Sequence, residues 1–485
     1  MAGYSDVVEG AQWGDEGKGK LIDMRLDTGN YSIVGRYGGG PNAGHTLSVN
    51  GHIIATHGLP SGVFHPKIHL YIGAGCVINP EKLVAEIKEV ESLGVSLEER
   101  LHISPFATLI QPHHLLTDSM YGGHLGTTGN GIGPAYSQRM MRSLGPNLED
   151  LRFAHAIISP HQARDIVKSN LGHCVSECLN PIKNHPNAHQ MQKIFDLFNN
   201  DPTQKYLSSL ARLGKYLERD PLFLTKQIES GKNVLFEGAQ GFMIDVVYGN
   251  TPFTTSSSTI AAGAYTGGDL SNKYHRKTMA VVKAIPSRVG AGPFVGELGG
   301  KKSEEYCAAK DSEGNTKHTK EFEHTTHNPQ DLLQSSDQFE LGIALRMLGG
   351  EYGATTKRPR RVGILDLPQL EYAAKLTGAD ELFITKMDQV ELFNNTLFHG
   401  PVMVDTYQIN GSKLNTYPIT TNELASVTPH SYLNFAATSL PTNATKWSDI
   451  PHSLVEFLTA IEDRTGCKVS GIGVGPEREK VIMRG

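Results

Sequence analysis

The sequence has few cysteines, no excess of positive charge and no long apolar run. Five cysteines scattered over 485 residues cannot form the dense disulfide framework of a small secreted protein, so we expect reduced thiols. A formal net charge of −5 provides no polybasic surface, which argues against nucleic acid as a partner. No stretch reaches the ~18 uninterrupted apolar residues of a membrane span, and residues 1–10 lack the features of a signal peptide. These absences predict a cytoplasmic protein that binds neither membranes nor nucleic acid.

The pattern of apolar residues predicts an α/β protein. With 39% hydrophobic and 20% charged residues, the chain can bury a substantial core. Short apolar runs alternate with longer helical patterns, such as the amphipathic residues 81–93, and this alternation is typical of a large, mostly parallel central sheet flanked by helices. The apolar runs that we expect to be buried strands are 32–35, 69–72, 233–236, 279–284 and 381–385.

We expect residues 1–485 to form a single domain with extra subdomains. Motifs that carry chemistry recur from residue 14 to residue 475, and they must converge to form one site. Two segments, near 160–230 and 297–350, are rich in polar residues. Their composition predicts insertions at the surface.

The run from Gln12 to Lys20 follows an apolar stretch and is typical of a phosphate-binding loop. Its three glycines allow backbone N–H groups to close on an anion, and Lys18 brings a charge to a terminal phosphate. It is not a Walker loop, because it lacks the leading glycine and the closing Ser or Thr. Phosphate repels a carboxylate unless a cation or a proton is also present, so Asp15 is a candidate metal ligand, general base or both. The alternative is a solvated surface turn.

Two further glycine-rich loops suit ligand binding. Residues 36–46 follow a predicted strand, where open α/β sheets bind ligands. His45 in this loop can gain or lose a proton near neutral pH, although a structural hydrogen bond is the alternative role. Residues 126–136 offer hydroxyls and bare backbone to a nucleotide monophosphate and lead to Arg139 and Arg142. These arginines suit phosphate capture, or they are solvated helix charges.

Three other features point to anion and purine recognition. Residues 353–361 place four cations and two hydroxyls in nine positions, which suits a ligand with two carboxylates or phosphates, with surface charge as the alternative. Gln240 follows a predicted strand and can both donate to and accept from a purine edge. Residues 385–388, Thr-Lys-Met-Asp, are similar to the N-K-x-D guanine reader of G proteins, whose Asp accepts from guanine N1–H and N2. This run favours GTP over ATP.

Taken in chain order, these motifs resemble those of the adenylosuccinate synthetase family over nearly the whole chain. The matching runs are QWGDEGKGK, NAGHT, GTTGxGIGPAY, LFEGAQG, RVGAGPF, GATT-x-R-x-RR, TKxD and residues 473–478. The resemblance implies a P-loop-like GTP site and a ligase that forms a C–N bond between L-aspartate and IMP. The reaction passes through 6-phosphoryl-IMP and yields adenylosuccinate, GDP and phosphate, the first committed step from IMP to AMP.

The resemblance also implies catalytic roles. Asp15 matches the base that removes the N1 proton of IMP, and His45 matches the acid near the transferred phosphoryl group. Lys18 and Gln240 match further catalytic residues. The carboxylate of Asp15 and the carbonyl of Gly44 match the ligands of one Mg²⁺ per subunit.

The same resemblance implies three sets of ligand contacts. The implied GTP contacts are Gly14, Asp15, Glu16, Gly17, Lys18, Gly19, Lys20, Gly44, His45, Thr46, Arg360, Lys386, Met387, Asp388, Gly473, Val474 and Gly475. The implied IMP contacts are Asp15, Glu16, Gly17, Lys18, Asn42, Ala43, Gly44, His45, Thr128, Gln240, Thr255, Val289, Arg358 and Arg142, the last matching an arginine that reaches the IMP of the neighbouring subunit in a homodimer. The implied aspartate contacts are Ala354, Thr355, Thr356, Lys357, Arg358, Pro359 and Arg360.

The chain departs from the family pattern in two loops and at one further position. Asn130 stands where the family usually has Arg, Lys357 replaces a Gly and Pro359 replaces an Arg. In the loop at residues 36–46, Gly38 and Pro41 replace the usual Gln and His. The loss of an arginine at Asn130 and the stiffness of Pro359 bear on aspartate binding.

Two alternative functions remain. The first is a related ligase acting on a 2-amino purine such as dGMP, and the retained Asp15 argues against it. The second is a GTP-binding regulator without ligase activity. A regulator needs no second substrate site, so the cation-rich run at residues 353–361 argues against this function.

Overall fold

The computed structural model describes residues 2–42, 44–49, 52–121, 127–142, 150–183, 202–353, 358–418 and 420–485. For residues 45–49, 52–54, 121 and 178–183 it describes the backbone alone. None of the helices in these ranges combines the length and the apolar composition that a membrane span needs.

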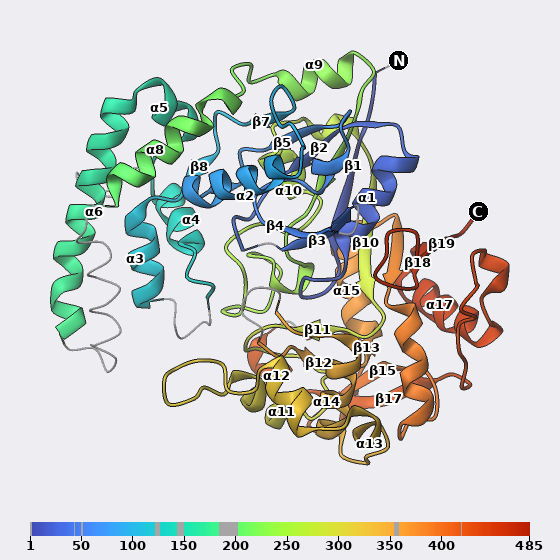
Figure 1. Cartoon of the computed structure of the whole chain (residues 1–485). Helices are drawn as coiled ribbons and strands as arrows, with labels where there is room; N and C mark the ends of the chain where they lie inside the picture. The colour runs from blue at the N-terminus through green and yellow to red at the C-terminus, as the bar shows by residue number, and fades with distance from the viewer. Residues whose placement is uncertain are drawn as a thin grey trace.

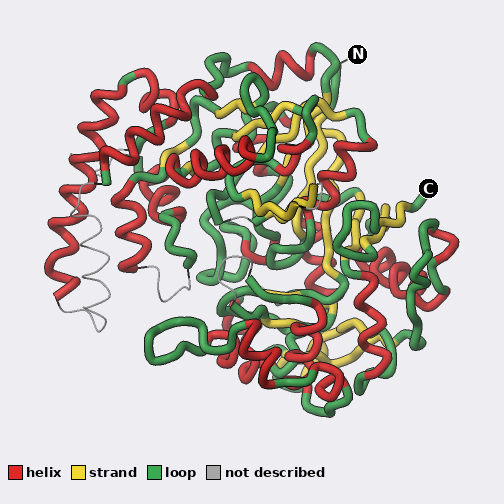
Figure 2. The backbone as a smooth tube through the Cα atoms, viewed as in Figure 1, coloured by secondary structure: helices red, strands yellow, loops and turns green. Residues whose placement is uncertain are grey.

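A nine-stranded sheet lies at the centre of the molecule, with helices around it (Figures 1 and 2). The strand order is β19-β18-β14-β10-β1-β9-β2-β5-β7, and every neighbouring pair is parallel except β18 and β19. This confirms the predicted α/β fold. The strands are β1 (Ser5–Gly10), β2 (Tyr31–Arg36), β5 (His69–Ile72), β7 (Leu101–Ile103), β9 (Asn233–Glu237), β10 (His275–Lys283), β14 (Glu381–Thr385), β18 (Lys468–Gly473) and β19 (Val481–Met483).

The predicted strands and helix are present with small shifts of their ends. All five apolar runs fall in sheet strands, namely β2, β5, β9, β10 and β14. The predicted helix at 81–93 is α2 (Pro80–Ser92), whose start is set by Asn79, because its side chain accepts hydrogen bonds from the N–H groups of Glu81 and Lys82. Apolar runs are a reliable signal here because strands such as β1 are buried on both faces.

Helices cover both faces of the sheet. On one face, α1 (Lys18–Thr28) and α2 pack Leu21 and Leu83 against a core that includes Val34 of β2. On the other face, α15 (Leu367–Thr377) and α17 (His452–Thr465) pack against β14 and β18. Further helices among the described residues are α3 (Pro112–Tyr121), α4 (Ile132–Met141), α5 (Phe153–Ile158), α6 (Pro160–Lys183), α8 (Thr203–Leu213), α9 (Phe223–Glu229), α10 (Gly263–Gly267) and α16 (Thr421–Ser426).

A smaller part lies at the bottom of Figure 1. It holds α11 (Gly300–Ala308), α12 (Lys320–Thr326), α13 (Pro329–Leu333), α14 (Gln338–Gly349), β11 (Ser287–Arg288), β12 (Arg361–Val362), β13 (Leu365–Asp366), β15 (Val402–Ile409), β16 (Ser412–Leu414) and β17 (Thr428–Asn434). Short strands elsewhere are β3 (His45–Val49), β4 (His52–Thr56), β6 (Val77–Ile78) and β8 (Thr108–Leu109).

The segment 297–350 is not confined to the surface, where its polar composition places it. Helix α14 buries Leu341 and Leu345 in a core shared with Tyr407 of β15. Arg346 of α14 is also buried, and it pairs with the buried Glu323 of α12 at 2.6 Å. Some charged residues of this segment therefore form internal ion pairs, a use that composition does not distinguish from solvation.

Glu9 on β1 generates a prediction about stability. The residue is fully buried, and burial raises the pKa of its carboxyl from 4.5 to about 8. Between these values the unfolded chain releases a proton that the folded chain keeps, so rising pH favours unfolding. We expect the melting temperature to fall between about pH 5 and about pH 8, and Glu9→Gln to make that fall smaller. Thermal melts of both proteins across this range test the prediction, and parallel pH profiles would contradict it.

Candidate active site

The loop between β1 and α1 folds around the buried carboxylate of Glu16. One oxygen, Oε1, accepts hydrogen bonds from the N–H groups of Gln12 at 3.2 Å and Gly14 at 2.7 Å. The other, Oε2, pairs with the Lys18 ammonium at 2.7 Å. Lys18 also donates to the carbonyl of Gln240 at 2.5 Å and is itself buried. The positive charge of Lys18 is thus already neutralised inside the loop.

The shape of this loop depends on left-handed backbone. Gly14 and Gly17 have φ of 91° and 94°, and Asp15 has φ of 56°, a region that favours glycine and tolerates Asp. The loop also packs closely on Gly241, because a Cβ there would lie 2.5 Å from the Gln12 carbonyl oxygen. Helix α1 begins directly after the loop, so its free N–H groups face the same region.

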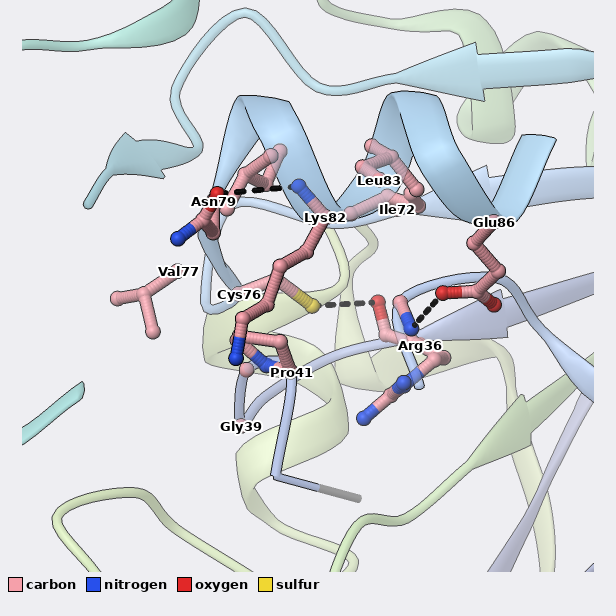
Figure 3. Close-up of a pocket in the computed structure, with 13 residues that line it drawn as sticks. Arg36, Gly39, Pro41, Ile72, Cys76, Val77, Asn79, Lys82, Leu83 and Glu86 are labelled. Carbon is pink, nitrogen blue, oxygen red and sulfur yellow. Dashed lines mark hydrogen bonds between the residues drawn. The ribbon is translucent and has the colours of Figure 1, made fainter. Parts of the chain in front are cut away.

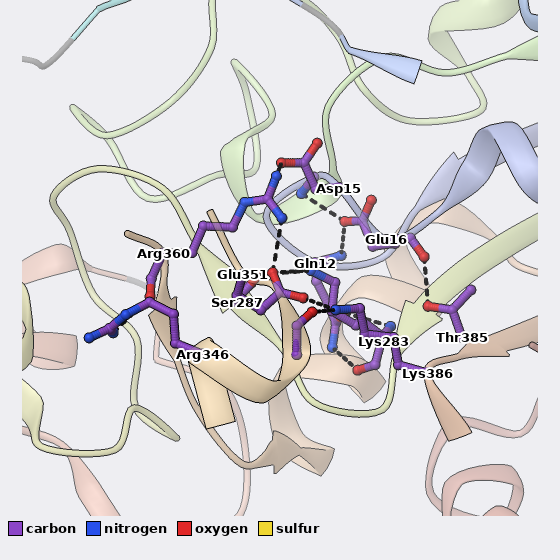
Figure 4. Close-up of polar contacts among 12 residues, drawn as sticks. Gln12, Asp15, Glu16, Lys283, Ser287, Arg346, Glu351, Arg360, Thr385 and Lys386 are labelled. Atoms are coloured by element: carbon purple, nitrogen blue, oxygen red, sulfur yellow. Dashed lines mark hydrogen bonds and ion pairs between the residues drawn. The ribbon is translucent and has the colours of Figure 1, made fainter. Parts of the chain in front are cut away.

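Asp15 points out of the loop toward Arg360. The carboxylate lies 2.6 Å from the Arg360 guanidinium, and 42% of the Asp15 side chain is exposed (Figure 4). This contact joins the predicted phosphate loop to the cation-rich run at 358–361. The two candidate loops are therefore parts of one site.

A second buried carboxylate, Glu351, holds three cations. Its Oε2 lies 3.0 Å from the guanidinium of Arg360 and 3.1 Å from the ammonium of Lys283, and it accepts a hydrogen bond from Ser287 at 2.7 Å (Figure 4). Its Oε1 pairs with Lys386. Lys386 also donates to the carbonyl of Gly349 at 2.8 Å. The guanine-reader run is thereby linked to Arg360 and, through it, to Asp15.

These contacts shift the pKa values of the cluster. Burial alone would raise the pKa of Glu351, but Lys283, Lys386 and Arg360 hold it well below its ordinary value of 4.5. The cluster therefore stabilises the fold above about pH 4.5, and this contribution is lost as the pH falls. Burial lowers the pKa of Lys283 to about 8, against the attraction of Glu351.

The C-terminal run 473–475 lies beside the guanine-reader run. The ammonium of Lys20 donates to the carbonyl of Gly475 at 2.6 Å and to that of Lys480 at 2.7 Å. Burial raises the pKa of Asp388 and lowers that of Lys20 to about 8, and the opposite charges of these two groups moderate both shifts. Met387 is buried. Lys20, Asp388 and Gly475 are thus neighbours, as a shared nucleotide site requires.

The predicted ligand loop at residues 36–46 contacts the loop that follows β9. Gln240, with φ of 57°, donates from its side-chain nitrogen to Oδ1 of Asn42 at 3.0 Å. Its Oε1 is buried and accepts no hydrogen bond from the described residues. Near this contact, a pocket with about 340 Å³ of empty space, part of it open to solvent, lies between the loop at residues 36–46 and α2 (Figure 3).

Several predicted site residues are not joined to these clusters. Arg142 is exposed at the end of α4, Val289 is 46% exposed and Thr128 is also exposed. The backbone of Thr255 donates to the Ile244 carbonyl. Ala43 and the residues Ala354, Thr355, Thr356 and Lys357 lie outside the described residues, as do the side chains of His45 and Thr46.

Sequence reasoning missed Glu351, Lys283 and Ser287. The available signal was position: Lys283 ends a buried strand, and Glu351 lies two residues before the cation-rich run. A lone acid beside four cations suggests pairing, but only the fold shows that this acid is buried.

The fold and the site define a class of nucleotide-dependent enzyme, in which a central parallel strand leads into a glycine-rich phosphate loop next to a guanine-reader run. The adenylosuccinate synthetase family model matches residues 7–482, and the chain belongs to this family. The family uses GTP to join L-aspartate to IMP, and this confirms the predicted function.

Curated relatives and solved structures agree with this assignment. The chain is 38% identical to "Adenylosuccinate synthetase 2" of Cupriavidus pinatubonensis, over 99% of this chain and 97% of the relative. It is 33% identical to the adenylosuccinate synthetase of Pelodictyon phaeoclathratiforme, over the same shares. The fully ligated adenylosuccinate synthetase of Plasmodium falciparum superimposes with a TM-score of 0.77 at 28% identity, with both chains fully covered.

A phage enzyme shares the fold at lower similarity. The cyanophage S-2L succinoaminodeoxyadenylate synthetase, bound to dGMP and dATP, matches with a TM-score of 0.56 at 18% identity, covering 100% of this chain and 96% of that one. This likeness shows the fold alone.

The cluster around Glu351 yields a prediction. Glu351→Gln keeps the side-chain shape but leaves Lys283, Lys386 and Arg360 without a shared counter-charge. We expect the free energy of unfolding to fall by about 3–5 kcal/mol, the usual cost of breaking a buried ion pair. Urea unfolding at neutral pH measures this decrease in the free energy of unfolding. Glu305→Gln, which removes the exposed pair with Lys301, is the matched control and should change little; equal stability of the two variants would contradict the prediction.

Proposed function

We propose that this protein carries out the ligation of L-aspartate to IMP at the site formed by Asp15, Arg360, Glu351 and Lys386. The observation that carries the proposal is the continuous chain of contacts from Asp15 through Arg360 and Glu351 to Lys386. It brings a candidate base, the cation-rich run and the guanine-reader run to one place. A GTP-binding regulator does not need such a link to a second substrate site.

The residue types suit the chemistry of the reaction. An amine cannot displace O6 of IMP directly, because hydroxide is a poor leaving group, whereas a phosphorylated O6 leaves readily. Removal of the N1 proton by Asp15 moves negative charge onto O6, which then attacks the γ-phosphate of GTP. His45 is the proposed acid beside the transferred group. The aspartate amine then attacks C6 and releases phosphate.

A divalent cation fits the donors of this site. Lys18 is neutralised by Glu16 at 2.7 Å, so the charge of a triphosphate must be met from elsewhere. The exposed Asp15 carboxylate and the Gly44 carbonyl are hard oxygen donors of the kind that Mg²⁺ prefers, and we propose that they hold one ion per subunit. When bound, Mg²⁺ neutralises charge that develops on the phosphoryl oxygens.

We assign the remaining substrate contacts from the loops. Asn42, joined to Gln240 at 3.0 Å, and Thr128 contact IMP. Arg358 and Arg360, with residues 354–357, hold the two carboxylates of aspartate, since guanidinium groups bind carboxylates with two hydrogen bonds. Asp388 reads guanine. We further propose that the enzyme works in the cytoplasm.

We also propose a homodimer in which Arg142 acts on the neighbouring subunit's IMP. The end of α4 is the support for this proposal. Met140 and Met141 are 76% and 45% exposed, and exposed apolar side chains beside an arginine are typical of an interface. Within a single chain, Arg142 at the exposed end of α4 has no hydrogen bond from its guanidinium to another described residue.

One assay tests the proposed function. Purified protein with GTP, Mg²⁺ and L-aspartate should form product with IMP and not with dGMP, and absorbance and phosphate release follow the reaction. Asp15→Ala and His45→Ala should each lower turnover at least ~10²-fold, the usual effect of losing a positioned acid or base. Turnover of dGMP in place of IMP would establish the 2-amino purine alternative, and near-normal turnover in either variant would refute the assigned mechanism.

The dimer proposal has a separate test by complementation. Arg142→Leu and Asp15→Ala variants should each be inactive, and a mixture should recover activity because a hybrid dimer holds one site with both residues intact. Free subunit exchange gives about a quarter of normal activity. Mass spectrometry confirms the exchange. Confirmed exchange without recovered turnover would show that Arg142 does not act across an interface.

A further inference from the structure

Lys82 is a cation that faces the site without an acidic partner. It projects from the first turn of α2 past Cys76 to Pro41 (Figure 3). Its ammonium donates a hydrogen bond to Oδ1 of Asn130. Burial lowers the pKa of Lys82, and no neighbouring charge offsets this shift. Among the described residues, Lys82 forms no ion pair, while enough of it is exposed for a ligand to reach it.

The position of this ammonium is defined by two loops of the proposed IMP site. Asn130, which accepts from Lys82, donates from Nδ2 to the hydroxyl of Thr128 at 2.9 Å. Pro41, toward which the lysine side chain extends (Figure 3), immediately precedes Asn42. The ammonium therefore lies between the loops that carry Thr128 and Asn42, the two residues that we assign to IMP.

The acidic residue that lines the same pocket, Glu86, does not neutralise Lys82. Glu86 accepts hydrogen bonds from three backbone N–H groups, those of His57 at 3.0 Å, Gly58 at 2.8 Å and Leu59 at 3.0 Å. Its oxygens are thus occupied on the other side of the pocket. A cation in this position is available to an incoming anion.

We propose that Lys82 binds the 5′-phosphate of the purine nucleotide, from the same subunit that carries Asp15. The inference rests on the proposed function only in requiring a purine 5′-monophosphate as substrate. Such a phosphate carries a charge of about −1.5 to −2 at neutral pH, and Arg142 offsets only one charge. Asn130 is neutral, so its loop adds no cation, and Lys82 supplies the second charge from α2.

Calorimetric titration of IMP tests this assignment. Lys82→Met keeps the length of the side chain and removes its charge, and we expect the Kd for IMP to rise at least about 10-fold, the usual loss for a charge-assisted hydrogen bond. Lys82→Arg should stay within about threefold of the unmodified protein, because it keeps the charge. Lys88→Met, an exposed lysine on the same helix, is the matched control.

Inosine and dGMP complete the experiment. Inosine lacks the phosphate, so its affinity should not change in Lys82→Met; an equal loss for inosine and IMP would show a distorted loop and overturn the proposal. Equal IMP affinity in Lys82→Met and Lys88→Met would also overturn it, as would equal losses in Lys82→Arg and Lys82→Met. Titration with dGMP gives the same test for the other purine, so the result stands whether or not IMP is the substrate that turns over.

Discussion

The ion cluster at Glu351 is the constraint on which the geometry of the site depends. A buried carboxylate is very costly unless it is paired and hydrogen-bonded. Glu351 meets this requirement with Lys283, Lys386 and Arg360, together with the hydroxyl of Ser287. These partners come from separate segments of the chain, so the requirement to neutralise one acid sets the relative positions of several loops. Arg360 then carries the constraint to Asp15.

The strand order explains why these segments meet. Strands β1, β10 and β14 are adjacent and parallel, so their carboxyl ends lie at one edge of the sheet. The phosphate loop follows β1, Lys283 ends β10 and Lys386 follows β14. Side chains at this edge can therefore meet although they are far apart in sequence: Lys283 lies 68 residues and Lys386 lies 35 residues from Glu351. The sheet places the residues near one another, and the buried acid fixes them.

Local patterns in the sequence predicted much of this arrangement. Buried strands appear as apolar runs, and glycine-rich loops appear after them, so the sheet and the loop at Asp15 could be found. Glu351 could not, because an acid beside a cation-rich run looks the same in sequence whether it is solvated or buried. The buried pair of Arg346 and Glu323 in the segment 297–350 escaped prediction for the same reason. The roles assigned to the site residues remain predictions, and those of His45 and residues 354–357 lack even a described side chain.

Two neighbouring acidic residues of the phosphate loop differ in function because the backbone orients their carboxylates differently. Composition alone does not show this difference. Asp15 has a left-handed backbone and directs its carboxylate outward to Arg360, whereas Glu16 turns inward and neutralises Lys18. Swapping Asp and Glu between these two positions would not swap their roles, because orientation and burial decide which carboxylate is available to a substrate. The inward acid shapes the loop and cancels its lysine. The outward acid is left as the group that can take a proton or hold a metal ion.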